Sequence, residues 1–104
     1  MDRHYDEFSR FFKALGDPSR LQLMHILLQA EGSLSVSALG EQVSIGQSTV
    51  SQHLRILKDA GVIRAERRGA SIFYQVDRPR LHEMGHRFQT LFGSLLFEGE
   101  ATPF

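Results

Sequence analysis

Apolar residues recur every three or four positions along most of the chain, which is the spacing of helices that bury one face. The first stripe runs from Tyr5 to Leu15 and stops at Gly16. Asp17-Pro18 then predicts a second helix, because Asp is a favoured N-cap and Pro fits the first helical position. This second helix is expected to end at Glu31-Gly32 and to bury Leu21, Met24, Leu27 and Leu28.

Two further helices are predicted between residues 35 and 61. Ser35 is a candidate N-cap for a short helix over 36–43. After a three-residue break, a longer helix is expected from Gln47 to about Ala60, with Gly61 as its C-terminal stop. Its buried stripe is predicted to consist of Val50, Leu54 and Leu57.

Beyond Gly61 the pattern changes from helical to alternating, which indicates β-strands. Residues 62–68 and 71–76 are predicted to pair as a β-hairpin around Gly69-Ala70. A last helix is expected from Asp77-Arg78-Pro79 to Gly99. Its apolar stripe comprises Leu81, Met84, Phe88, Leu91, Phe92 and Leu95.

Two helices joined by a three-residue break and followed at once by a hairpin are typical of the winged helix-turn-helix fold. A chain of 104 residues is too short for a second core. We therefore expect a mainly helical protein with a β-hairpin wing, organised as a single domain over residues 1–104.

The composition excludes several classes of functional site. The chain has no cysteine, so disulfides, zinc–thiolate sites and thiol redox switches are excluded. It has no phosphate-binding glycine loop, no nucleophile with an adjacent base and no paired carboxylates, so an enzyme is not expected. No apolar run approaches the roughly 20 residues of a membrane span, and we expect a soluble, cytoplasmic protein without a membrane partner.

Charge is distributed unevenly, although 12 Lys and Arg balance 12 Asp and Glu. Residues 47–74 hold five cations and two acids, a net charge of +3. Residues 1–46 carry a net charge of −2 and residues 75–104 a net charge of −1. The basic stretch coincides with the predicted fourth helix and the hairpin, so a neutral total does not exclude a nucleic-acid partner.

The fourth helix has the composition of a DNA recognition helix. When its apolar stripe faces the core, short polar side chains turn outward at its N-terminal end, where Gln can pair with adenine and Ser or Thr can reach base edges or phosphate. The predicted DNA contacts are Gln47, Ser48, Thr49, Ser51 and Gln52 near the bases, and Arg55, Lys58, Arg67 and Arg68 near the backbone.

Two alternatives remain open at this point. The polar residues at the start of the fourth helix could form an ordinary first turn without a role in DNA binding. The arginines of the hairpin, Arg64, Arg67 and Arg68, could simply be solvated, and this is what we expect for Arg64. A winged helix could also serve as a protein-interaction module that does not bind DNA.

The same residues carry a family resemblance. Residues 12–21, 47–63 and 73–76 closely resemble the ArsR/SmtB family of small bacterial winged-helix repressors, and the likeness extends over about residues 8–97. The resemblance implies a homodimer that binds an inverted-repeat operator and releases it when an effector binds. It places base readers at Gln47, Ser48, Ser51 and Gln52, and wing contacts at Arg67, Arg68 and Ser71.

One departure from the family lies in the turn of the helix–turn–helix. The chain has Ser44-Ile45-Gly46 where Gly-Leu-Ser is usual, and Gly is a weaker N-cap than Ser. The operator, the effector and the choice between repression and activation are not defined by the sequence.

Aromatic residues concentrate in the two terminal helices, which hold seven of the ten. One short chain cannot easily cover both helices as well as the helix–turn–helix core, so a two-fold interface between copies is predicted. The alternative is that these residues pack on one another within one chain. The predicted interface residues are Tyr5, Phe8, Phe12, Phe88, Leu91, Phe92 and Leu95.

Histidines give only a weak metal signal. The resembled family places metal ligands in a Cys-x-Cys on the third helix or along the last helix, where this chain has the apolar Leu91 and Phe92. His82 and His86 are four apart and suit Zn or Ni, but two ligands do not make a site. We therefore predict no metal cofactor, with a nickel or zinc switch at this pair as the alternative.

The other two central histidines are assigned to packing and to solvent. His53 borders the buried stripe of the fourth helix, so it is predicted to be packed and hydrogen-bonded instead of contacting DNA. His25 is expected at the surface of the second helix.

Overall fold

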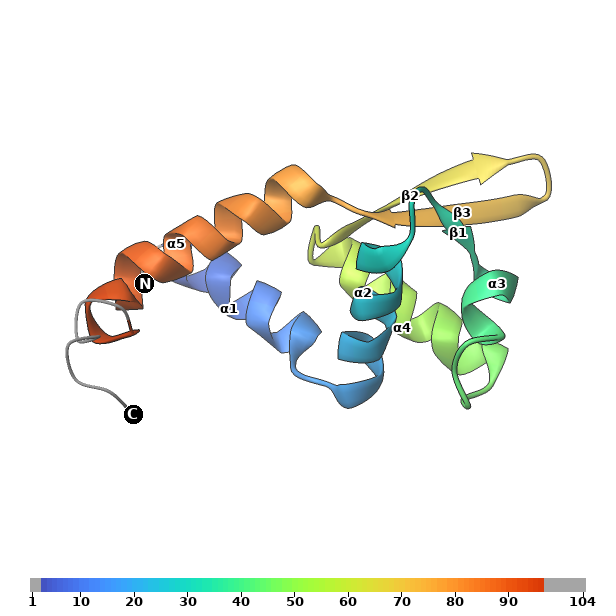
Figure 1. The fold of residues 1–104 in the computed structure, drawn as a ribbon, viewed down its shortest axis with the longest axis horizontal. Coiled ribbons are helices and arrows are strands. Elements are labelled where there is room, and N and C mark those ends of the chain that lie inside the picture. The colour runs from blue at the N-terminus through green and yellow to red at the C-terminus, as the bar shows by residue number, and fades with distance from the viewer. Residues whose placement is uncertain (1–2, 97–104) are drawn as a thin grey trace.

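A helical body and one long β-hairpin make up the protein (Figure 1). The structure, a computed structural model, describes residues 3–96 and the side chains of residues 5–93. In chain order the elements are α1 (Arg3–Leu15), α2 (Pro18–Gln29), β1 (Leu34–Ser35), α3 (Val36–Gly40), α4 (Gln47–Asp59), β2 (Ile63–Arg68), β3 (Ser71–Val76) and α5 (Arg78–Leu96). The predicted winged helix-turn-helix fold is confirmed.

Local signals in the sequence explain the start of two helices. The carboxylate of Asp17 accepts the backbone N–H of Arg20 at 3.1 Å, which caps α2, and Pro18 occupies its first turn. The hydroxyl of Ser35 accepts the backbone N–H of Ala38 at 3.1 Å and caps α3. Both predicted N-caps are therefore confirmed.

The end of α4 is equally well defined. Gly61 has a φ of 78°, a conformation that favours glycine, and its N–H donates to the carbonyl of Lys58 at 2.9 Å. The next N–H, of Val62, reaches back to the carbonyl of Leu57 at 3.0 Å. These two bonds form a Schellman motif, which satisfies the last carbonyls of α4 and turns the chain into the hairpin.

The hairpin carries a short third strand at one side. The sheet order is β1-β3-β2 and all pairs are antiparallel. In the hairpin, Ile63 pairs with Val76 and Arg68 with Ser71, so the loop is Gly69-Ala70, where Gly69 has a φ of 64°. The predicted hairpin is confirmed, with β2 beginning one residue later than expected.

Three further details differ from the sequence predictions. β1 was not anticipated, because two residues are too short to show an alternating pattern. α3 ends at Gly40 and not at residue 43, because the N–H of Gln42 bonds three residues back, to Leu39, and tightens the last turn. Leu21 is 53% exposed, because it lies on the side of α2 opposite to the buried Leu23 and Leu27.

One core joins the elements. Val50, Leu54 and Leu57 of α4 are fully buried, as predicted, and pack with buried residues of α1, α2, α3, β2, β3 and α5. Within the described residues, no helix combines the length and apolar character required to cross a membrane.

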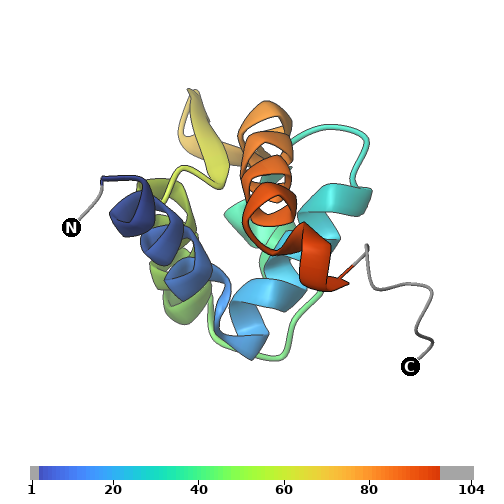
Figure 2. The same ribbon diagram turned by 90° about the vertical axis from the view of Figure 1, so that its left-hand side faces the viewer.

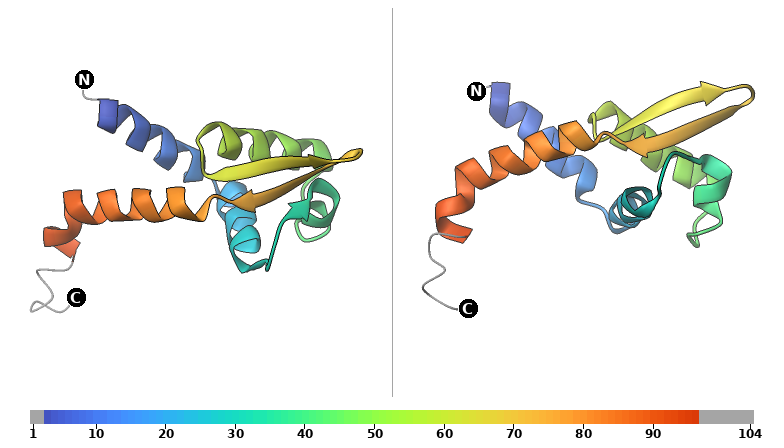
Figure 3. Two further views of the ribbon diagram at one scale, coloured as in Figure 1. Left: turned by 90° about the horizontal axis from the view of Figure 1, so that it is seen from above. Right: turned by 45° about the horizontal axis from the view of Figure 1, so that its top comes forward.

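The terminal helices and the wing lie at opposite ends of the molecule. α1 and α5 form one end, where Figure 2 shows them side by side, and the β2–β3 hairpin projects from the other (Figures 1 and 3). The radius of gyration, 15.8 Å, exceeds the about 13 Å typical of a compact domain of this length. The two ends therefore extend beyond the core and leave faces on which partners can bind.

Candidate DNA-binding surface

The outer face of α4 holds the polar residues predicted to read DNA. Because Val50, Leu54 and Leu57 anchor the inner face, the positions on the opposite side of the helix turn outward. The exposed residues on this face are Gln47, Ser48, Thr49, Ser51, Gln52, Arg55 and Lys58. The structure thus presents every helix residue of the predicted DNA surface to solvent.

The N-terminal end of α4 has no side-chain cap. Gly46 precedes the helix in an extended conformation, and its carbonyl accepts the N–H of Val50 at 3.0 Å. The N–H groups of the first turn therefore lack the side-chain acceptor that a Ser N-cap supplies. Free N–H groups at a helix N-terminus favour an anion, so the end of α4 suits a DNA phosphate.

The two arginines of the wing tip lie on different faces of the hairpin. Side chains alternate along β2, so Arg67 shares a face with the buried Ile63, whereas Arg68 shares the other face with Glu66. The guanidinium of Arg68 is 2.5 Å from the Glu66 carboxylate and 4.6 Å from the centroid of the Phe73 ring. Arg67 forms no ion pair with any residue of the described chain.

A hollow of about 250 Å³ lies between the start of α4 and the wing. Gln47 and Ser51 line it from α4, and Ser71 and Ile72 line it from β3. Ile72 is the cross-strand partner of Arg67, so this arginine stands on the face of the wing that adjoins the hollow. The structure thus brings recognition-helix and wing residues to one concave surface.

Two contributors to this hollow were missed by the sequence prediction. Ser35 and Ser37, at the start of α3, line the hollow together with Gln47. Their only sequence signal was the N-cap role of Ser35, which gave no indication that the segment lies beside the wing. The pairing of β1 with Phe73 and Tyr74 brings it there.

Three arginines outside this surface, Arg78, Arg80 and Arg87, are held by contacts within the chain. Arg78 donates to the carbonyl of Leu28 at 2.9 Å. Arg80 and Arg87 of α5 approach the carboxylate of Glu7 on α1 at 3.0 and 3.1 Å. These cations serve intramolecular contacts, whereas Arg55, Lys58 and Arg67 remain exposed on α4 and the wing.

Arg64 behaves as expected for a solvated strand residue. Its side chain is 58% exposed and lies 4.0 Å from the carboxylate of Asp77. It stands at the base of the wing, beside Asp77 and away from the tip that carries Arg67.

His53 is packed and hydrogen-bonded, as predicted. Its side chain is 15% exposed, and its Nδ1 lies 3.2 Å from Nη1 of Arg20. Its Nε2 lies 4.0 Å from the carboxylate of Asp17. The pKa of Asp17 is lowered, first by the hydrogen bond from the backbone N–H of Arg20 and then by the charge of Arg20, while burial opposes the shift.

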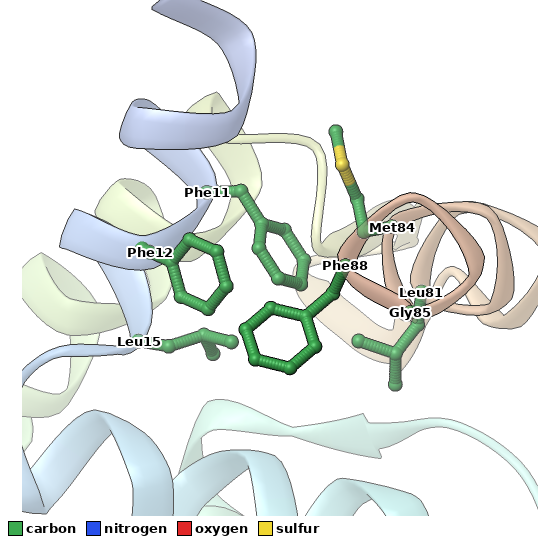
Figure 4. A pocket seen from close by; sticks show the side chains of 7 residues that line it. All are labelled: Phe11, Phe12, Leu15, Leu81, Met84, Gly85 and Phe88. Carbon is green, nitrogen blue, oxygen red and sulfur yellow. The ribbon is translucent and has the colours of Figure 1, made fainter. Parts of the chain in front are cut away.

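An apolar groove separates α1 from α5 at the opposite end of the molecule (Figure 4). Its volume is about 340 Å³, and the aromatic rings of Phe11, Phe12 and Phe88 point into it. Around it, four predicted interface residues are exposed on their own chain: Tyr5 (54%), Phe12 (42%), Leu91 (47%) and Phe92 (43%).

The other predicted interface residues differ in their placement. Phe8 is only 7% exposed, because it packs inside the protomer with its ring 4.8 Å from that of Phe12, so its assignment to the interface is corrected to the core. Phe88 is half-buried between Phe12 and Phe92. The side chain of Leu95 lies outside the described residues.

The surface histidines stand apart from both regions. His82 and His86 are exposed on α5, and among the described residues no three potential ligands come together around a point. His25 is exposed on α2 and lies 3.1 Å from the amide of Gln29, in agreement with its predicted surface position.

Known proteins share this arrangement. A family model described as "Bacterial regulatory protein, arsR family" matches residues 17–65, the segment from the start of α2 into β2. A biofilm growth-associated repressor of Xylella fastidiosa is 33% identical over 92 residues, which cover 88% of this chain and 79% of that protein. An uncharacterised HTH-type transcriptional regulator of Methanocaldococcus jannaschii is 36% identical over 80 residues, covering 77% of this chain and 89% of that protein. The chain belongs to the ArsR family.

A solved structure agrees with this assignment. The homodimeric winged helix-turn-helix DNA-binding domain of a possible ArsR-family regulator from Mycobacterium bovis superposes with a TM-score of 0.70 at 27% identity. The match covers 90% of this chain and 88% of that domain. As a member of the ArsR family, the protein is a DNA-binding transcriptional regulator and not an enzyme.

Proposed function

We propose that this ArsR-family regulator is a repressor that binds an inverted-repeat operator as a homodimer. In this proposal the α4 helices of two copies enter successive major grooves, and the wing tips contact the flanking backbone. The observation that carries it is that α1 and α5 lie at one end of the molecule and the start of α4 and the wing lie at the other (Figure 1). The polar residues of α4 are exposed at the second end, and Tyr5, Phe12, Leu91 and Phe92 are exposed on α1 and α5. A two-fold axis through the α1–α5 end leaves both recognition helices free.

The residues divide into two groups in this scheme. Gln47, Ser48, Thr49, Ser51 and Gln52 are the proposed contacts to base edges and nearby phosphates, and Arg55, Lys58, Arg67 and Arg68 the proposed contacts to the backbone. Tyr5, Phe12, Leu91 and Phe92 form the proposed interface, together with the edge of Phe88. Because bacterial DNA lies in the cytoplasm, we infer that the protein works there.

Selection from a random duplex library with the wild-type protein tests the proposal. We expect enrichment of a palindrome whose half-site centres are about one helical turn, or a multiple of it, apart. Two protomers should bind each duplex in sedimentation equilibrium, and a reporter placed behind the selected site should be repressed.

The competing view, a winged helix that binds only proteins, predicts the opposite result. No palindrome would be enriched, and random duplex at low salt would bind no better than heparin. That outcome would contradict the proposed function. Enrichment of a palindrome together with activation of the reporter would contradict repression alone.

A further inference from the structure

A cluster of hydrogen-bonding groups joins three helices where the chain turns from α1 into α2. Nε of Arg20 donates to the carbonyl of Ala14 at 2.6 Å, and Nη2 donates to the carbonyl of Lys13 at 3.4 Å. Nη1 of the same guanidinium lies 3.2 Å from Nδ1 of His53 on α4. One side chain on α2 therefore contacts both α1 and α4.

The chemistry of each partner suits a guanidinium. Lys13 and Ala14 lie in the last turn of α1, where carbonyls have no intrahelical donor and the helix dipole favours a cation. A guanidinium presents five N–H groups in a rigid planar fork, so it can bind these carbonyls and a third acceptor together. Lysine offers a single point charge and cannot reproduce this geometry.

His53 supplies the third acceptor. Arg20 can only donate, so Nδ1 of His53 accepts, and the neutral ring carries its proton on Nε2. That N–H faces the carboxylate of Asp17, 4.0 Å away, which also caps α2. The imidazole therefore accepts a hydrogen bond on one side and faces a carboxylate on the other.

The hydrogen bond between Arg20 and His53 restrains rotations of α4 that apolar packing alone permits. Val50, Leu54 and Leu57 determine which face of α4 is buried, but apolar contacts are non-directional and permit small rotations and slides. A charge-assisted hydrogen bond at the edge of the buried stripe is directional and fixes the angular setting of the helix. The neighbour of His53 in the chain is Gln52, a proposed base contact.

The same contact reaches the proposed dimer interface. Lys13 and Ala14 directly follow Phe12, whose exposed ring lines the α1–α5 groove. We propose that Arg20 and His53 are positioning residues that fix the angle of α4 relative to α1, and thereby align Gln47 and Gln52 with the bases. This inference rests on the proposed function and concerns specificity, while the residues themselves need not touch DNA.

Substitutions at His53 test the contacts on the two sides of its ring separately. His53→Asn keeps an acceptor near the position of Nδ1, His53→Gln keeps a polar group near the position of Nε2, and His53→Leu removes both. Arg20→Lys retains the charge but not the fork. The matched control is His25→Asn, since His25 is exposed on α2 and its ring lies beside Gln29 of the same helix.

Each variant is measured in three ways. Circular dichroism and sedimentation check that it is folded and has the wild-type oligomeric state. Fluorescence anisotropy then gives Kd for the duplex selected by the wild-type protein and Kd for a scrambled duplex of the same composition. The ratio of the two constants reports base reading, whereas a loss of folded protein would weaken both equally.

We expect the ratio to fall at least about fivefold in His53→Leu, His53→Gln and Arg20→Lys, the effect of about one mismatched base pair. His53→Asn should retain most of the wild-type ratio, and His25→Asn all of it. Binding to scrambled duplex should change little, because the exposed cations are untouched.

Three results would overturn the inference. One is a ratio of the two dissociation constants in His53→Leu that equals that of the wild-type protein. If His53→Leu does not fold, the same result in Arg20→Lys overturns the inference. Another is a wild-type ratio in His53→Gln together with a reduced ratio in His53→Asn, which would assign the loss of base reading to the contact with Asp17. The third is a proportional loss on both duplexes, which indicates a purely structural role. If the wild-type protein selects no palindrome, the proposed function itself fails, a result separate from these.

Discussion

The guanidinium of Arg68 lies 4.6 Å from the centroid of the Phe73 ring, across the two strands of the wing. Arg68 is also paired with Glu66, so its charge is partly compensated and its side chain is held against the sheet. Arg67, next to it in the chain, is exposed and forms no ion pair with the described residues. Two adjacent arginines at the wing tip therefore differ in their freedom to bind phosphate.

This difference gives a prediction for the wing. Arg67→Ala should lower the slope of log K against log salt concentration by about 1, the effect of one lost phosphate contact. Arg68→Ala should lower it less, and Glu66→Gln should raise affinity for random duplex at low salt by freeing Arg68. Fluorescence anisotropy over a salt series measures all three.

Arg10→Ala is the control for the wing, because Arg10 is also exposed but lies on α1, far from the hairpin. Equal slopes for Arg67→Ala and Arg68→Ala would show that the pairing with Glu66 does not persist on DNA. A slope change in Arg10→Ala would show that DNA extends to α1.

The second prediction concerns base reading by α4. Gln52→Ala and Gln47→Ala should each cost about 1–3 kcal/mol on the selected duplex and relax the preference at one base position of each half-site. Binding to scrambled duplex should hardly change, since neither side chain is charged. A repeated selection with each variant identifies the position that has become degenerate. An unchanged consensus for Gln52→Ala would remove that residue from the set of base readers.

A third prediction addresses the α1–α5 end. Leu91→Asp and Phe92→Asp place a charge on side chains that are 47% and 43% exposed on one chain and are proposed to be buried between two. Each should shift sedimentation from dimer to monomer at micromolar protein and weaken operator binding, because one protomer reaches only one half-site. Phe92→Leu, which keeps the apolar character, should remain dimeric. Dimers of wild-type stability in both Asp variants would place the interface elsewhere.

The fourth prediction uses the charge of Asp17. Its pKa lies below its ordinary value of 3.8, chiefly because its carboxylate accepts the backbone N–H of Arg20. A depressed folded-state pKa adds stability above the unfolded-state value, and this contribution is lost as the pH falls through the folded-state value. Asp17→Asn retains an N-cap but not the charge.

Urea unfolding of both proteins between about pH 7 and about pH 3 checks this. The wild-type protein should exceed Asp17→Asn in free energy of unfolding near neutral pH, and the difference should shrink towards the acidic end. A difference that stays constant across this range would show that the charge of Asp17 does not contribute to the stability of the protein.

The fifth prediction concerns metal. His82 and His86 supply two exposed ligands on α5, and no third potential ligand joins them within the described residues. Equilibrium dialysis against micromolar nickel or zinc should therefore find no stoichiometric binding, and the double variant His82→Ala/His86→Ala should behave like the wild-type protein. Stoichiometric metal that is lost in the double variant would establish a switch at this pair.

Local sequence patterns define the order and type of the main elements. Helix periodicity, the Asp17 and Ser35 caps and the stop at Gly61 are local signals, because each depends on hydrogen bonds or dihedral angles within a few residues. The outward face of α4 followed from the same periodicity once Val50, Leu54 and Leu57 were assigned to the core. The charge pattern also located the basic surface, because the cations of residues 47–74 lie in one contiguous stretch of the chain.

The contacts between segments that are distant in the chain could not be predicted from local patterns. β1 forms through pairing with Phe73 and Tyr74, about 40 residues later, and brings Ser35 and Ser37 beside the wing. Phe8 and Leu21 were misassigned because periodicity shows that a residue can be buried but not which neighbour covers it. The fork of Arg20 between Ala14 and His53 likewise depends on the packing of three helices, a long-range relation that no local pattern encodes.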